Sequence, residues 1–163
     1  MTSITVANTD DTVLASLQTI LANATVAGRS VFEDVSLCGS RQEAHDKKFT
    51  ASPLAVLIYE ATDVYLIADL EEGCVLKITV LVAVREDTPA LRARVLSRCI
   101  NAARNALNTG IPSNAHGFPD DAGDFHPRMM IGTPEREDDI EDPWTIAWLP
   151  VEVSYVISSR TTH

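Results

Sequence analysis

The sequence has few of the residues that mark several large classes of protein. Its 163 residues include 3 cysteines, an odd number with no C-x-x-C spacing, so neither a disulfide framework nor a zinc-finger pattern is indicated. No apolar run approaches the ~20 residues that a membrane-spanning helix needs, and no basic segment precedes an apolar block near the N-terminus. We therefore expect neither export nor membrane insertion, and we expect reduced cysteines that pack in the core of a cytoplasmic protein.

Basic residues are also scarce, because 13 Lys and Arg stand against 23 Asp and Glu and give a net charge of −10. Tight binding of nucleic acid without sequence preference depends on cations that replace counterions around phosphates, so this charge argues against it. DNA could still pass close to the protein without being held. Apolar residues make up 45% of the chain, which predicts one folded domain over residues 1–163 with a substantial core.

The motifs of common enzymes are missing too. The sequence contains no G-x-G-x-x-G, G-x-x-x-x-G-K-[ST] or G-x-S-x-G pattern, so a triad of Ser36, His45 and Asp46 would lack its nucleophile elbow. Residues 108–127 form a long loop rich in Gly, Pro, Asn and Asp. The best case for an enzyme is a metal site in this loop, formed by His116, Asp120, Asp121, Asp124 and His126. Their spacing matches neither H-x-H nor H-x-x-x-H, so we expect no catalytic residue, no cofactor and no bound metal.

What the sequence does contain is a strand of residues 74–85 that turns through residues 86–88 into a helix of residues 89–107. Alternate residues of the strand are all apolar, which predicts a central strand with one face in the core. These residues are Leu76, Ile78, Val80, Val82 and Val84. The other face is mixed and includes Lys77 and Thr79.

The helix of residues 89–107 has an apolar stripe and a basic surface. Thr88 and Pro89 suit its start, and the stripe consists of Leu91, Val95, Cys99, Ala103 and Leu107. Arginines lie off this stripe, at positions 92, 94, 98 and 104. Such arginines usually form a solvated helix face. On an otherwise acidic chain they can also form a contact surface for acidic groups.

The remaining elements are shorter or less regular. A first helix is predicted over residues 11–24, with further strands over residues 31–37, 53–60, 64–68, 129–131 and 144–158. Residues 38–52 are predicted to form an exposed loop, and the acidic residues 135–142 a turn. Pro150 lacks a backbone donor, which indicates a sheet edge or bulge at that point of the last strand. Trp144 and Trp148 share the less apolar face of this strand, and we expect the core to bury one of them.

This order of elements predicts an α+β fold. We expect a mainly antiparallel, twisted sheet with two helices packed on one face. The two longest predicted strands exceed the usual five or six residues, so strands and loops are expected to project from the domain.

Five elements carry a resemblance to a known family: the opening helix, the strand beginning at Pro53, the strand that ends at Val84, the helix from Pro89 and the strand from Trp144. In their order, the chain resembles the tail terminator proteins of tailed bacteriophages. These proteins are also called tail completion or minor tail proteins. The resemblance covers most of the chain and rests on the order, length and texture of the elements. The long loop of residues 108–127 and the acidic turn are additions to that pattern.

The resemblance implies a structural virion protein rather than an enzyme. It implies a six-membered ring at the tail end or neck of the virion, assembled in the host cytoplasm, that caps the tail tube and offers a joining surface to a head-side connector or stopper protein. DNA would pass through the lumen without specific binding. A head-tail connector or adaptor ring is the alternative in the same class, and a small metal-dependent enzyme using residues 116–126 is the alternative in another. The predicted contact of the ring or tube joins Arg92, Arg94 and Arg98 to the acidic residues Glu137, Asp138 and Glu141 of a neighbour.

Overall fold

A computed structural model of the chain describes residues 3–6, 10–47, 51–68, 71–109, 128–137 and 143–162. Helices and strands alternate irregularly along the sequence. In chain order they are β1 (Ser3–Val6), α1 (Asp10–Ala22), β2 (Thr25–Val26), β3 (Arg29–Ser30), β4 (Asp34–Cys38), α2 (Arg41–Lys47), β5 (Leu54–Ala68), β6 (Glu71–Arg85), α3 (Pro89–Thr109), β7 (Arg128–Ile131), β8 (Glu135–Glu137) and β9 (Trp144–Thr162). The predicted loop of residues 108–127 lies outside the described residues apart from the last two residues of α3.

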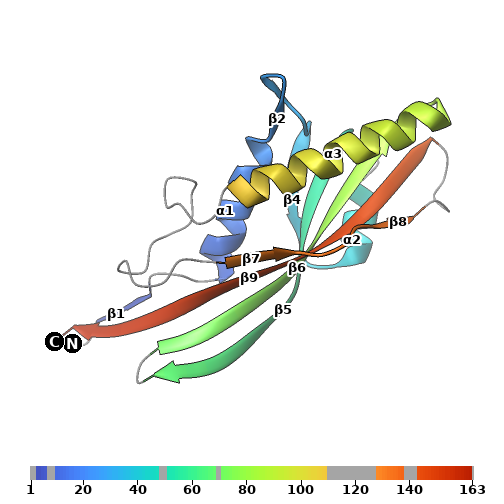
Figure 1. Ribbon diagram of the computed structural model, residues 1–163. Coiled ribbons are helices and arrows are strands. Elements are labelled where there is room, and N and C mark those ends of the chain that lie inside the picture. The colour runs from blue at the N-terminus through green and yellow to red at the C-terminus, as the bar shows by residue number, and fades with distance from the viewer. Residues whose placement is uncertain are drawn as a thin grey trace.

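Seven strands form one mixed sheet in which most neighbours are antiparallel. The strand order is β1-β9-β6-β5-β4, with β7 and β8 also beside β9. The pair β4 and β5 is parallel and the others are antiparallel. The strands β5, β6 and β9 run past the helices toward one end of the molecule, where β1 pairs with the end of β9 (Figure 1). The predicted α+β class, its mainly antiparallel sheet and its projecting strands are confirmed.

Strand β6 is the centre of the sheet and is buried on both faces over much of its length. Residues of one parity, from Cys74 to Val84, pack in the larger core with α1 and α3, as the alternation predicted. Residues of the other parity at one end, Thr79, Leu81 and Ala83, pack under α2. Toward the opposite end, Val75 and Lys77 on this second face are only half-buried. The strand therefore changes from burial on both faces to burial on one.

The two predicted helices lie on the same face of the sheet, as expected (Figure 1). In α1, Val13, Leu17 and Leu21 are fully buried. In α3 the buried side chains are Leu96, Cys99, Ile100, Ala103 and Leu107. The predicted stripe is thus correct in the second half of α3, whereas Leu91 is 40% exposed at its start.

The segment predicted as an exposed loop, residues 38–52, contains helix α2 on the opposite face of the sheet. Ser40 caps this helix, because its Oγ accepts a hydrogen bond from the backbone N–H of Glu43 (3.2 Å), and the Glu43 carboxylate reaches back to the N–H of Gly39 (3.3 Å). Ala44 is fully buried. The Ser-x-x-Glu spacing is a capping signal that the prediction missed, because one apolar residue in a short helix leaves no stripe to detect.

Several other boundaries differ from the prediction, for example β4 at residues 34–38 in place of 31–37 and β9, which extends to residue 162. Helix α1 ends at Ala22, two residues earlier than predicted, and is followed by a hairpin in which Ala27 (φ 52°) and Gly28 (φ 77°) join β2 to β3. The predicted strands of residues 53–60 and 64–68 are one strand, β5, with a register shift between Tyr59 and Ala61. The acidic turn begins with strand β8, which pairs with β9; residues 138–142 lie outside the described part of the chain.

Pro150 marks an interruption on one side of β9, as predicted. Strand β7 pairs with residues 151–154 and β8 with residues 146–148, so Pro150 lies opposite the gap between the two strands. The carbonyl of Pro150 accepts a hydrogen bond from the N–H of Gly132 (2.8 Å). A Cβ atom on Gly132 would lie 2.7 Å from the Pro150 Cγ, so glycine allows this close approach.

We predict that Gly132→Ala destabilises the protein. The added methyl group overlaps the rigid proline ring, so the free energy of unfolding should fall by about 1–3 kcal/mol. Gly39→Ala is the matched control, because a Cβ atom added at Gly39 would have no neighbour within 4 Å. Urea unfolding followed by circular dichroism measures both. Equal stability of the two variants would contradict the close approach.

Candidate site: an arginine groove on helix α3

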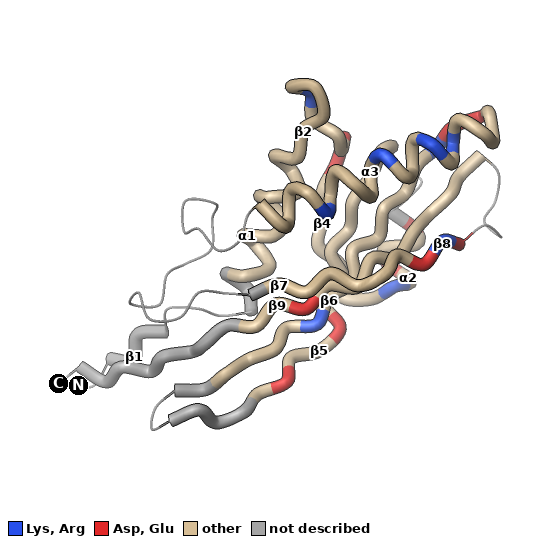
Figure 2. The backbone as a smooth tube through the Cα atoms, viewed as in Figure 1, with Lys and Arg blue, Asp and Glu red and all other residues tan. Residues whose placement is uncertain are grey.

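A groove of about 720 Å³ lies between α3 and the β2–β3 hairpin. Its lining combines three arginines and other polar side chains with the apolar side chains of Val26, Ala93 and Ala102. The lining residues are Thr25, Val26, Ala93, Arg94, Ser97, Arg98, Asn101, Ala102, Asn105 and Arg136. Figure 2 shows Lys and Arg along α3, whereas Asp and Glu appear on β5 and β8. We call this surface the arginine groove.

Two of the three guanidinium groups come from α3 and the third comes from β8. Arg94 and Arg98 are four residues apart, so they share one side of the helix. Arg136 reaches the groove from β8, and its Nη2 donates a hydrogen bond to the Ser97 hydroxyl. None of the residues that line the groove is acidic. The groove is therefore a positive site within a negatively charged chain.

Within one chain, the described residues of the predicted ring or tube contact lie at different places, and their contact between copies stays a prediction. Arg94 and Arg98 line the groove, whereas Arg92 lies outside its lining and donates from Nε to the carbonyl of Glu86 (2.8 Å). Glu137 neighbours Arg136 in sequence, but its carboxylate bonds to a tryptophan that packs on the smaller core, on the α2 side of the sheet. Asp138 and Glu141 lie outside the described residues.

Sequence reasoning missed the rest of the groove. Ser97, Asn101 and Asn105 follow Arg94 and Arg98 at helical spacing, so a search of the polar side of α3 could have found them. Arg136 depends on the pairing of β8 with β9, which no local pattern shows. The β2–β3 hairpin is short, and its Ala27-Gly28 turn lacks the Asn-Gly or Asp-Gly signal.

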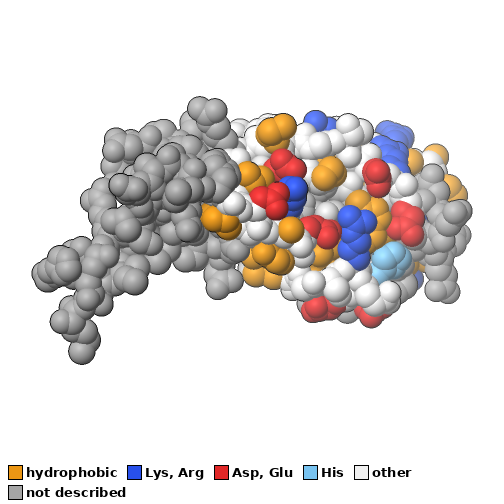
Figure 3. Space-filling view, turned by 90° about the horizontal axis from the view of Figure 1, so that it is seen from below, with side chains coloured by type: hydrophobic (Ala, Val, Ile, Leu, Met, Phe, Trp, Pro, Cys, Tyr) orange, Lys and Arg blue, Asp and Glu red, His pale blue; other side chains and the backbone are white. Residues whose placement is uncertain are grey.

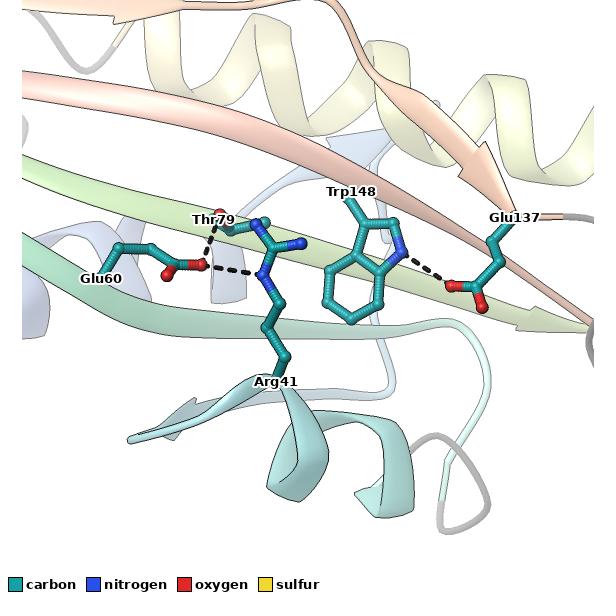
Figure 4. Close-up of polar contacts among 5 residues, drawn as sticks. All are labelled: Arg41, Glu60, Thr79, Glu137 and Trp148. Carbon is teal, nitrogen blue, oxygen red and sulfur yellow. Dashed lines mark hydrogen bonds and ion pairs between the residues drawn. The ribbon is translucent and has the colours of Figure 1, made fainter.

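A second polar cluster lies on the α2 side of the sheet (Figure 4). Glu60 accepts hydrogen bonds from Arg41 (3.1 Å) and from the nearly buried Thr79 (3.0 Å). Trp148 donates its indole N–H to Glu137 (2.9 Å), and the Arg41 guanidinium lies 5.2 Å from the centroid of the Trp148 ring.

This cluster connects α2 to the sheet. His45 of α2 lies beside Trp148, with ring centroids 5.8 Å apart, and its Nε2 is 3.6 Å from the Glu137 carboxylate. Trp144 is the buried tryptophan, as expected for one of the pair, and Trp148 packs at the edge of the smaller core. Figure 3 shows that this side of the molecule mixes acidic, basic, histidine and apolar side chains without a single-sign patch.

The described residues do not assemble the chemistry of the enzyme alternatives. Ser36 donates its hydroxyl proton to Asp34 rather than to His45. Cys38, Cys74 and Cys99 are buried and form no disulfide with one another, and burial raises the pKa of Cys99 from 9.0 to about 11 despite the opposing charge of Arg98. Cys99 is therefore a protonated packing group at neutral pH.

The described residues contain neither a cluster that could hold a metal ion nor a helix that could span a membrane. In the described ranges, no group of three or more His, Cys, Asp and Glu residues is placed to hold a metal ion. The loop that was considered for a metal site, with His116, Asp124 and His126, lies outside these ranges. Among the described helices, none has the length and apolar content to cross a bilayer.

Comparison of the sequence with models of known protein families gives no match, and comparison with curated proteins gives none either.

We predict that Glu60→Ala destabilises the protein by about 1–3 kcal/mol, because the nearly buried Thr79 hydroxyl loses its acceptor and α2 loses its ion pair with β5. Asp63→Ala is the control on the same strand. The side chains of Lys77 and Asp63 are 44% and 62% exposed in this ion pair, so little change in stability is expected. Thermal unfolding measures both, and equal shifts would show that the cluster does not anchor α2.

Proposed function

We propose that the chain is the structural subunit of a ring that ends a bacteriophage tail tube. In this role the ring caps the tube, offers a surface to a head-side connector or stopper protein, and lets DNA pass through its lumen. The proposal rests on the resemblance of the element order to tail terminator proteins, and on one feature of the sheet that suits assembly of many copies.

That feature is an edge of β5 that has no partner within the described chain. Strand β4 pairs only with Leu54–Ile58. From residue 59 to residue 68, β5 pairs with β6 on one side, and no described strand pairs with it on the other. These residues include the acidic Glu60 and Asp63 but no Pro, Lys or Arg, and Val64 is 57% exposed. A long edge of this kind is a template for a strand of another chain.

The opposite side of the sheet is different, as a contact between unlike surfaces within a ring requires. There β7, β8 and β1 follow one another along β9, and their outer edges face away from β6. If the β5 edge of one copy meets this side of the next, the contact joins two unlike surfaces. Repeated unlike contacts close into a ring when the rotation between copies allows it.

The negative net charge of the chain is compatible with a lumen through which DNA passes. A wall that is acidic on balance repels phosphate, so DNA can move past it without being trapped. The arginine groove is then available for a protein contact, with an adjacent copy, the tube or the head-side protein as the candidate partners.

We predict that Val64→Lys weakens assembly of the ring by at least about tenfold in concentration, because an edge lysine disfavours strand pairing. Its side chain is already exposed, so the fold should be unaffected. Sedimentation velocity over a concentration series, with negative-stain microscopy, should show the wild-type chain reaching six times its 17.7 kDa mass.

Ala15→Lys is the matched control, since it adds the same charge at an exposed position of α1 away from the edge. It should assemble as the wild-type chain does. Assembly of Val64→Lys at wild-type concentration would refute pairing through β5.

A further inference from the structure

The arginine groove brings three guanidinium groups together on a chain with a net charge of −10. We propose that it binds an extended acidic segment of a partner protein. The proposal does not depend on ring formation, because every residue of the groove belongs to one chain.

The length and spacing of the groove fit an extended peptide. Its α3 residues run from Ala93 to Asn105, a distance of about 18 Å along the helix axis, which matches about five residues of extended chain. Arg94 and Arg98 lie one helical turn apart, or about 5–6 Å. Alternate side chains of an extended peptide are about 6.6 Å apart and point the same way. Two carboxylates separated by one residue can therefore meet both arginines.

The polar groups of the groove fit a polypeptide better than a nucleic acid. Guanidinium groups bind carboxylates through paired hydrogen bonds, and Arg136 keeps donors beyond the one that bonds to Ser97. The amides of Asn101 and Asn105 both donate and accept, as binding of a peptide backbone requires. None of the lining residues is aromatic, so the bases of a single strand would find no stacking surface there.

The ligand is more consistent with a different protein than with a second copy of this chain. The acidic run of this chain begins with Glu135 and Glu137, and both belong to strand β8. The Glu137 carboxylate already accepts the Trp148 indole N–H. Arg136 stands between them in the sequence and would bring a positive charge toward the groove of a neighbour.

The test is binding of a fluorescein-labelled six-residue peptide of alternating Glu and Ser, measured by fluorescence anisotropy on the purified full chain. The comparison probes are the same peptide with Gln in place of Glu and a thymidine oligonucleotide of equal charge. We expect saturable binding of the Glu peptide and little binding of the Gln peptide. Arg98→Gln should weaken the binding roughly tenfold, as loss of one charged hydrogen-bonding group implies.

Two further variants make the test specific. Arg104→Gln removes the same charge from α3 outside the groove, and it should change the affinity much less. Asn101→Asp adds a negative charge inside the groove at an exposed position, and it should weaken binding even if Arg98→Gln proves unfolded by circular dichroism.

Several outcomes would overturn the proposal. One is the absence of saturable binding, and another is equal loss of binding in the Arg98 and Arg104 variants. Tighter binding of the oligonucleotide that depends on Arg98 would make the groove a nucleic-acid site. Tighter binding of a peptide with the sequence of residues 135–142 would assign it to a second copy. Failure of the ring would leave the peptide measurement unchanged, because Val64 lies outside the groove.

Discussion

The burial of strand β6 between β5 and β9 is the constraint on which the rest of the structure depends. Both neighbours pair with β6 along nearly its whole length. One face of β6 forms the larger core with α1 and α3, and half of the other face is covered by α2. Truncation of a fully buried residue such as Leu81 would cost about 2–5 kcal/mol, so these packing positions leave little freedom to the arrangement of the helices.

The same constraint explains where the surfaces for partners lie. Helix α3 must present Leu96, Cys99 and Ala103 to the sheet, so Arg94 and Arg98 turn away from the core and into the groove beside the β2–β3 hairpin. Because β5 and β6 extend beyond β4, part of the β5 edge is left without a partner in the described chain. The packed centre of the molecule thus leaves two distinct contact surfaces. One is the unpaired edge of β5, which presents backbone groups, and the other is the positively charged arginine groove. Two such surfaces suit a protein that joins copies of itself and also holds other chains, which is what we propose for a tail terminator.

The sequence predicted those parts of the fold in which apolar residues recur at a regular spacing, that of a strand or of a helix, over many positions. The alternation from Leu76 to Val84 and the helical spacing from Cys99 to Leu107 each repeat often enough to define a face. Helix α2 and strand β8 are too short to repeat, and they are held by tertiary contacts such as the pairing of Arg41 with Glu60. The candidate site divides in the same way. Arg94 and Arg98 are visible as neighbours on one helix, whereas Arg136 joins them only because β8 pairs with β9.

The central claim is that the protein completes phage tails, and electron microscopy of lysates tests it most directly. Cells that produce the phage with and without this gene should be compared by negative staining. The account predicts that loss of the gene gives tails that are overlong, or tails that accumulate without joining to filled heads. Normal infectious particles from the cells without the gene would contradict it.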